Sequence, residues 1–396
     1  MIYLFLAFVL AIQVVVFDFF GNRIGKDFWW NFNFILLVAL AGFRWEVGGD
    51  SLTYQNAYEN NLLTLGEYFS GSIFTEGWEP GFVFLMTLSK SLISEFWFFQ
   101  IIHALIVNYV MFRFLRRYTT YGFLSLFIYY SFNYLYFNTE ILREALAICV
   151  FVMMYEELKQ KNIRKYYFLN IIAIAFHYSA LILLIFPILS RLRLTVRNLF
   201  LFLLVGMLFP YLLQIVRASL SFLPFADRAL GKLDTYLMYG LNLNGSIFNT
   251  ICFILFPLLI IRLAKGTTAF KDLEILYMPY LFVAMIFVIH SGFGRFINYF
   301  IPFMMVGLSQ VIFTILTFKR YRQVKFLFVL LAILPPFFYK MSYYFRSTDD
   351  LYPNTVVFNR WYPYSSVFEK ESFSFRHILY QEGMRQSHER AINKEK

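Results

Sequence analysis

The chain alternates between long apolar stretches and short polar loops along most of its length. A helix that crosses a bilayer needs ~20 consecutive apolar residues, and only helices or closed barrels satisfy their backbone groups there. The pattern predicts an all-α integral membrane protein, a polytopic bundle of about 11–13 membrane segments. The candidate segments are roughly 1–20, 28–43, 80–94, 96–115, 121–137, 141–157, 166–190, 198–214, 246–262, 275–291, 296–316 and 324–340. The first lacks a basic n-region and a cleavage site, so we expect a retained helix.

One apolar stretch, 166–189, carries His177 at its middle and basic residues at both ends. A single crossing would place one basic cluster outside, against the preference of such clusters for the cytoplasmic side. The conflict disappears if the chain enters the membrane, turns near His177 and returns to the same side. An ionisable residue at the tip of such a broken helix indicates a functional site.

A second irregularity lies at 80–115, which must start outside and end inside although it resembles two crossings. We expect Glu79-Pro80-Gly81 to dip into the membrane, so that 80–93 is only a partial span. Non-helical backbone at that depth is tolerated where it lines an enclosed or wet cavity. The two irregularities therefore predict broken or re-entrant helices around a periplasm-facing cavity.

The basic loops orient the whole chain. We assign six of them to the cytoplasm: Arg23/Lys26, Arg113–Arg117, Lys159–Lys165, Arg191–Arg197, Arg262–Lys271 and Lys319–Lys325. The opposite side receives 44–80, 138–140, 215–245, 292–295 and the tail from 341. We expect a membrane domain over 1–345, with periplasmic loops 44–80 and 215–245, followed by a periplasmic tail over 346–396 whose polar end, 382–396, is partly disordered.

Composition agrees with this class. The chain is 60% hydrophobic and 15% charged, whereas a soluble domain has about 25% charged residues. Its net charge of +11 is concentrated in loops between apolar segments, so it does not indicate nucleic-acid binding. Cys149 and Cys252 lie in apolar segments and predict buried residues. No P-loop, dinucleotide or metal-ligand motif is visible, and we expect no metal and no cofactor.

Three arginines fall at the outer ends of helices, where the orientation rule disfavours them: Arg44, Arg143 and Arg295. Guanidinium is an always-charged planar fork that matches phosphate oxygens. Three forks at one leaflet, with His177 approaching from its turn, predict a site for an anionic lipid headgroup and a diphosphate in particular.

Each residue also has a simpler interpretation. Arg44 would reach the interface or pair with Glu46, and Arg143 would pair with Glu140 or Glu144. Arg295 would be solvated between glycines, His177 would be a satisfied core residue, and Asp50 would cap a turn or helix. Their convergence favours a shared site.

Five short motifs resemble the EpsG-like, Wzy-type polysaccharide polymerases, in order and over the chain to about Phe368. They are Arg44-Trp45-Glu46-Val47-Gly48-Gly49-Asp50-Ser51-Leu52-Thr53-Tyr54, Leu142-Arg143-Glu144-Ala145-Leu146-Ala147, Phe176-His177-Tyr178-Ser179-Ala180-Leu181-Ile182, Arg295-Phe296-Ile297-Asn298-Tyr299-Phe300 and Tyr362-Pro363-Tyr364. Ser51, Glu144 and Gly49 depart from the usual aromatic, Gln and Thr, and the tail after Phe368 is longer than the family leads us to expect.

The resemblance implies a metal-independent enzyme of the bacterial inner membrane with its active site at the periplasmic face. It would transfer a growing glycan from undecaprenyl diphosphate onto an incoming lipid-linked repeat unit, as in O-antigen, lipopolysaccharide or exopolysaccharide synthesis. The partners implied are those lipid-linked oligosaccharides, membrane lipids, a Wzx-type flippase and a Wzz-type chain-length regulator.

On this basis we assign Arg143 and Arg295 to the donor diphosphate and Arg44 to a third or acceptor-side contact. His177 or Asp50 would take the acceptor proton, and Glu144 would orient Arg143. Three other functions use similar residues: an O-antigen ligase, a lipid-linked oligosaccharide flippase and a membrane acyltransferase. A flippase needs charges through both leaflets, and an acyltransferase does not need several outer arginines.

Overall fold

The computed structural model describes residues 2–72, 77–220, 243–264, 268–317, 357–381 and Arg385. These residues form helices without a β-strand; Arg44 and Ser366 make an isolated antiparallel bridge. The expected segment 324–340 and most of the expected loop 215–245 lie outside the described residues. So does the expected disordered end over 382–396, apart from Arg385.

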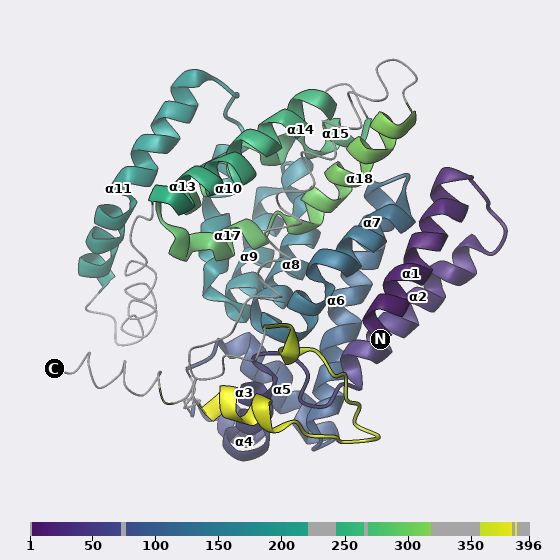
Figure 1. Cartoon of the computed structure of the whole chain (residues 1–396). Helices are drawn as coiled ribbons and strands as arrows, with labels where there is room; N and C mark the ends of the chain where they lie inside the picture. The colour runs from purple at the N-terminus through teal and green to yellow at the C-terminus, as the bar shows by residue number, and fades with distance from the viewer. Residues whose placement is uncertain are drawn as a thin grey trace. The chain divides into compact units, whose positions relative to one another are not determined.

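The helical elements follow the apolar pattern (Figure 1). In chain order they are α1 (Ile2–Gln13), η1 (Val14–Phe19), α2 (Lys26–Gly42), α3 (Ser51–Asn56), η2 (Ala57–Asn61), α4 (Leu65–Phe69), α5 (Pro80–Leu92), α6 (Phe96–Tyr118), α7 (Gly122–Tyr129), η3 (Tyr130–Tyr134), η4 (Tyr136–Glu140), α8 (Leu142–Lys159), α9 (Ile163–Phe176), η5 (Tyr178–Ile185), α10 (Phe186–Leu189), α11 (Val196–Leu220), α13 (Leu243–Thr250), η6 (Ile251–Leu255), α14 (Phe256–Ala264), α15 (Thr268–Leu273), η7 (Glu274–Leu276), α16 (Tyr277–Ile289), η8 (Ser291–Gly294), α17 (Arg295–Asn298), α18 (Ile301–Thr317) and η9 (Val357–Arg360).

Within the described part of the chain, four continuous helical stretches are long and apolar enough to cross a membrane. They are Ile2–Phe19, Phe96–Tyr118, Val196–Ile215 and Lys271–Ile289. A fifth is broken: Ser291–Asn298 and Ile301–Phe313 pass the same criterion together but are bent by 70°. The described residues are therefore consistent with an all-α, multi-pass membrane protein that contains a broken span or a re-entrant loop, and the count of 11–13 segments stays a prediction.

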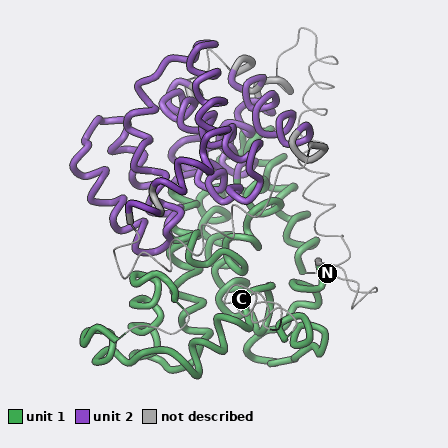
Figure 2. Tube along the Cα trace, turned by 90° about the vertical axis from the view of Figure 1, so that its left-hand side faces the viewer, with its two compact units in different colours: residues 1–113, 126–146, 336–396 green, residues 114–125, 147–335 purple. Residues whose placement is uncertain are grey.

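The chain forms two compact units, which we describe separately (Figure 2). Unit 1 contains residues 1–113, 126–146 and 336–396, and unit 2 contains 114–125 and 147–335. Cys149 and Cys252, both of unit 2, are buried as expected.

In unit 1, α5 packs onto the loop that the sequence places outside. At one end Lys90 Nζ donates to the carbonyl of Tyr58 at 2.6 Å, and at the other Tyr68 Oη donates to the carbonyl of Pro80 at 3.2 Å. Its 13 residues extend only ~20 Å, against a hydrocarbon core of ~30 Å. The short length and these contacts agree with the expected partial span, and α6 is the candidate crossing after it.

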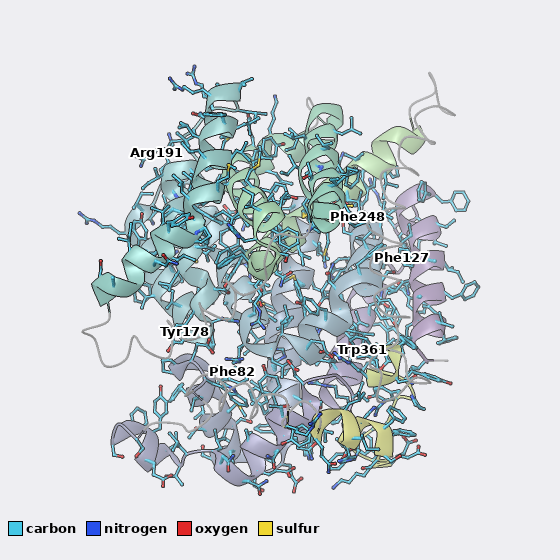
Figure 3. All side chains as sticks on the ribbon, turned by 60° about the vertical axis from the view of Figure 1, so that its left-hand side comes forward. Phe82, Phe127, Tyr178, Arg191, Phe248 and Trp361 are labelled. Carbon is cyan, nitrogen blue, oxygen red and sulfur yellow. The ribbon has the colours of Figure 1, made fainter. Side chains whose placement is uncertain are left out.

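The C-terminal segment of unit 1, yellow in Figure 1, runs beside the start of this outer loop. Trp45 N donates to the carbonyl of Ser365, and Val367 N donates to that of Phe43, each at 2.8 Å. Trp361, labelled in Figure 3, is buried, and its indole donates to Thr139 Oγ1 at 2.8 Å. Segments in direct contact lie on one side of a membrane, which agrees with the assignment of both to the same face.

The turn before α3 fits tightly against η4. Gly48 has φ +116°, and a Cβ there would lie 2.7 Å from Thr139 Cβ, so both backbone and space require glycine. Gly49 N donates to Glu140, whose other oxygen lies 4.0 Å from Arg360 Nη1. Burial, and next the Asp50 carboxylate, raise the pKa of Glu140 to about 7.

In unit 2, the chain reverses at His177 as the sequence predicts. Asn170 Nδ2 donates to the carbonyl of Ala180 at 3.1 Å, and Tyr166 Oη donates to that of Leu183 at 2.7 Å. The partners move away from His177 together along both arms, so α9 and η5 are antiparallel. Figure 3 shows Tyr178 and Arg191 at opposite ends of the returning arm.

Loops assigned to the cytoplasm also contact one another in unit 2. Arg117 Nη2 lies 3.1 Å from Glu156 Oε1, beside α8. Lys159 Nζ lies 2.6 Å from Asp272 Oδ1, which joins the end of α8 to the end of α15. Three loops that charge alone places on one side are therefore together in the structure.

The hairpin predicts that cysteines at Asn162 and Leu192 lie on the same side of the membrane. Both positions are exposed, and we expect both cysteines to be shielded from an impermeant maleimide in intact spheroplasts. A cysteine at exposed Asn60, in the outer loop, is the matched positive control. Labelling at only one of positions 162 and 192 would restore a simple crossing and contradict the hairpin.

The raised pKa of Glu140 predicts that stability falls as the pH rises. The folded pKa of about 7 exceeds the ordinary value of 4.5, so this stabilisation is complete below pH 4.5 and is lost as pH rises through 7. We expect Glu140→Gln to flatten the melting temperature of the solubilised protein between pH 5 and 8, whereas Glu95→Gln, at an exposed site, retains the wild-type slope. Equal slopes in all three proteins would exclude Glu140 as the source.

Candidate functional site

Two helix breaks of unit 2 meet through the side chains of His177 and Arg295. Arg295 Nη1 lies 3.0 Å from His177 Nε2, and a second contact joins Ser179 Oγ to Tyr299 Oη at 2.8 Å. His177 is buried and Arg295 is half-buried. The structure therefore brings together two of the residues that the sequence nominated, 118 positions apart.

Local sequence explains both breaks. His177 ends α9 in an extended conformation, with φ −157° and ψ +128°, and its Nδ1 lies 3.3 Å from the backbone N of Ser179. The second break contains Gly294, where a Cβ would lie 2.9 Å from the Phe287 ring. In an apolar environment broken backbone needs such side-chain partners, so these residues hold irregular structure where a regular helix would otherwise continue.

The contact with Arg295 favours an uncharged imidazole. A guanidinium only donates, so Nε2 must accept, and a protonated imidazole has no lone pair with which to accept. His177 is therefore neutral in this contact, with its acceptor nitrogen beside a fixed cation. A neutral base adjacent to a cation is suited to a reaction in which a proton is removed while negative charge develops on a leaving group.

A second candidate cluster surrounds Arg143 in unit 1. Arg143 Nη1 lies 2.6 Å from Glu79 Oε2, its Nε donates to Tyr54 Oη at 3.4 Å, and the guanidinium lies 5.5 Å from the Trp78 ring centroid. The Glu79 side chain is 0% exposed and that of Arg143 is 18% exposed. Nη2 makes no hydrogen bond with the described residues, so this amino group remains available to a ligand.

Glu79 is the functional residue that sequence reasoning did not nominate. The sequence offered Glu140 or Glu144 as the partner of Arg143, but Glu140 contacts Gly49 instead. Glu79 occupies the N-cap position of α5, immediately before Pro80 at N1. The sequence did contain a signal for Glu79: it is an acid directly before a proline that starts a helix, where the chain was expected to enter the membrane. Several other acids in the same loop made this signal hard to single out.

Arg44 lies deeper than expected. It is 1% exposed, its Nε donates to the carbonyl of Val47 at 3.2 Å, and its Nη1 donates to that of Ala41. Burial lowers the pKa of Arg44 to about 10, so the group stays charged at neutral pH. Interfacial exposure and pairing with Glu46 are both wrong, because Glu46 contacts Ser372 and His377. Its phosphate or acceptor contact stays a prediction.

Asp50 and Glu144 are placed without a demonstrated role. Asp50 is exposed at the N-cap position of α3, where its side chain makes no capping hydrogen bond. Glu144 is buried in the first turn of α8. The proposed roles of Asp50 as the alternative base and of Glu144 as the partner that orients Arg143 stay predictions. So does the joint site of all six residues.

Comparison with known proteins now identifies the family. No curated protein and no solved structure matches the chain. The model of the EpsG family matches residues 27–366, a range that contains every candidate residue of both clusters. The chain therefore belongs to the EpsG family.

Proposed function

We propose that this protein is a glycosyl polymerase that extends a lipid-linked glycan at the periplasmic face of the bacterial inner membrane. Membership of the EpsG family and the multi-pass helical fold support a polysaccharide polymerase in general. The specific observation in favour of glycosyl transfer is the 3.0 Å contact between the neutral imidazole of His177 and the guanidinium of Arg295.

In the proposed reaction, a hydroxyl of the incoming repeat unit attacks the anomeric carbon of the glycan carried on undecaprenyl diphosphate. The new carbon–oxygen bond forms as the bond from that carbon to the phosphate oxygen breaks, and the bonding pair leaves with the diphosphate. His177 Nε2 accepts the hydroxyl proton, and Arg295 stabilises the charge on the leaving group. Atoms and charges balance without a further reactant.

The same contact orders the steps. While Arg295 donates to Nε2, the lone pair of His177 is occupied and unavailable to a hydroxyl. A diphosphate competes for the guanidinium because it is an anion that can bind this fork with two parallel hydrogen bonds, whereas the imidazole is an uncharged acceptor. Donor binding therefore releases the base, so the imidazole is not available to activate water before the donor is bound.

Arg143 is proposed as a second phosphate contact, in unit 1. Glu79 and Tyr54 hold two of its three nitrogens and leave Nη2 for an oxygen of the ligand. Because the Glu79 side chain is fully buried, it is a positioning residue and does not itself touch the substrate. Asp50 is the alternative proton acceptor, and Arg44 the proposed third or acceptor-side contact.

The first test of this function uses purified protein in liposomes with lipid-linked repeat unit as the sole substrate. We expect wild type to produce a ladder of longer glycans, and His177→Ala and Arg295→Ala each to lose at least ~100-fold in rate. His290→Ala, at the break beside η8, is the matched control and retains the ladder, because the His290 ring contacts the backbone carbonyl of Gly206 and the Phe293 ring but neither His177 nor Arg295 in the described residues.

Other outcomes of this assay identify the alternatives. A product formed only when a lipid A-core acceptor is added would indicate a ligase. Movement of the repeat unit across the bilayer without a new glycosidic bond would indicate a flippase. Normal ladders in both variants, at equal protein level, would refute the assignment of His177 and Arg295. The proposed flippase and chain-length regulator are not needed in this reconstituted system.

A second series tests the positioning of Arg143. Arg143→Ala and Arg143→Lys should both fail to polymerise, since Lys has no planar fork for Glu79 and a phosphate together. Glu79→Gln retains an acceptor but loses the charge that fixes the guanidinium, and we expect a loss of ~10–100-fold in kcat.

Tyr54→Phe is the control for this series, because it preserves the ring and removes only the 3.4 Å contact; we expect a change below ~threefold. Thermal unfolding of each variant establishes that the protein is folded. Wild-type kcat in folded Glu79→Gln would show that this carboxylate does not position Arg143.

A further inference from the structure

The C-terminal segment of the described chain continues beyond the family-matched region and folds back onto the signature loop. The family match ends at residue 366, while the described chain runs on to 381. Ser372 Oγ donates to Glu46 Oε1 at 3.0 Å, and His377 Nε2 lies 3.0 Å from Glu46 Oε2. These contacts, like the loop itself, belong to unit 1.

Ser372 and His377 both bind the side chain of Glu46. Its backbone has φ +52°, a left-handed conformation that a residue with a side chain seldom adopts. Its side chain is only 6% exposed, and each carboxylate oxygen has one partner from the C-terminal segment. If both partners were removed, the buried Glu46 carboxylate would lose these two contacts at a turn whose backbone is already strained, and this would cost free energy.

Neighbouring contacts extend the same attachment. Trp45 Nε1 donates to Ser372 Oγ at 3.2 Å, and Lys370 Nζ lies 5.2 Å from the Trp45 ring centroid. Further along, Asn56 Nδ2 donates to Tyr380 Oη at 3.1 Å, at the end of α3. Residues 370–381, which we term the clamp, therefore contact the loop on both sides of Asp50.

We propose that Ser372 and His377 are positioning residues that hold the turn from Arg44 to Asp50 in its working geometry. This inference rests on the proposed polymerase function, because the turn carries Arg44 and Asp50, the candidate contacts to the acceptor or its proton. The clamp acts through Glu46 and does not touch the substrate.

The test compares variants of the full-length protein in the liposome assay with lipid-linked repeat unit. We expect Ser372→Ala/His377→Ala to lower kcat/KM by about tenfold, as for a displaced site. When His377→Gln replaces His377→Ala in this double variant, the Gln side chain can still donate to Glu46, so we expect most of the lost kcat/KM to return. Ser374→Ala is the matched control, since Ser374 is exposed on the same segment, and should equal wild type.

A double-mutant cycle separates a specific contact from general loosening. If Glu46 transmits the effect, Glu46→Gln should reduce the rate similarly, and adding Ser372→Ala/His377→Ala should cause little further loss. Fully additive losses, or a wild-type rate in the folded Ser372→Ala/His377→Ala protein, would overturn the proposal.

Hydrogen exchange tests the clamp independently of the reaction. Amides of residues 45–56 should exchange faster in Ser372→Ala/His377→Ala than in wild type, while those of the α9–η5 hairpin are unchanged. If wild type fails to polymerise but this exchange pattern appears, the polymerase assignment fails and the attachment stands. Unchanged exchange at 45–56 rejects the clamp whatever the activity.

Discussion

The hydrogen bond between Arg295 and His177 is the constraint on which the interior of unit 2 depends. It joins two places where the chain leaves helical geometry, and it does so at 3.0 Å with a cation as donor. Helices in an apolar interior continue by default, because a break exposes backbone groups that have no water to bind. Two breaks persist here because each supplies side chains that the other needs, with Ser179 and Tyr299 forming the second connection.

In unit 1 a half-buried arginine is also held by a side chain, but here its partner is a carboxylate and the two form an ion pair. The guanidinium of Arg143 contacts a fully buried carboxylate at 2.6 Å, so this contact is neutral overall. A buried pair of this kind costs much desolvation energy and is weak evidence for stability, whereas removal of one partner costs ~3–5 kcal/mol. Such a pair is better understood as a device that holds one cation in a defined orientation. The contact of Arg295 with the His177 ring likewise fixes the position of a cation.

The sequence predicted much of the fold because the membrane imposes strong rules. Basic clusters on both sides of one apolar stretch predicted the reversal at His177, and the antiparallel contacts of Asn170 and Tyr166 confirm it. The doubtful span at 80–93 was recognised from the crossing count, and α5 is indeed short and packed on the outer loop. Charge bias and apolar length carry information about topology that does not depend on packing.

Side-chain partners were harder to predict than topology. Arg143 had nearby acids at positions 140 and 144, but its partner is Glu79, 64 positions away, because the packing of α5 determines which carboxylate arrives. For Arg44 the simpler alternative was a position at the interface, but the side chain is buried and donates to the backbone carbonyls of Ala41 and Val47. Sequence patterns identify residues that need partners, whereas the choice of partner is set by tertiary contacts that no local pattern encodes.

The two contacts of His177 determine which role the ring can take. Arg295 needs an acceptor at Nε2, and the N–H of Ser179 needs one at Nδ1, yet a neutral imidazole has a single acceptor nitrogen. The charge-assisted contact at 3.0 Å outweighs the 3.3 Å contact with a backbone amide. The Arg295 contact therefore favours the tautomer with its acceptor at Nε2, which is the form that a base needs. If the contact between Nδ1 and the Ser179 N–H were the stronger one, Nε2 would carry the proton and His177 would donate to a phosphate. The Arg295 contact thus favours the tautomer that His177 needs for its proposed role as a base.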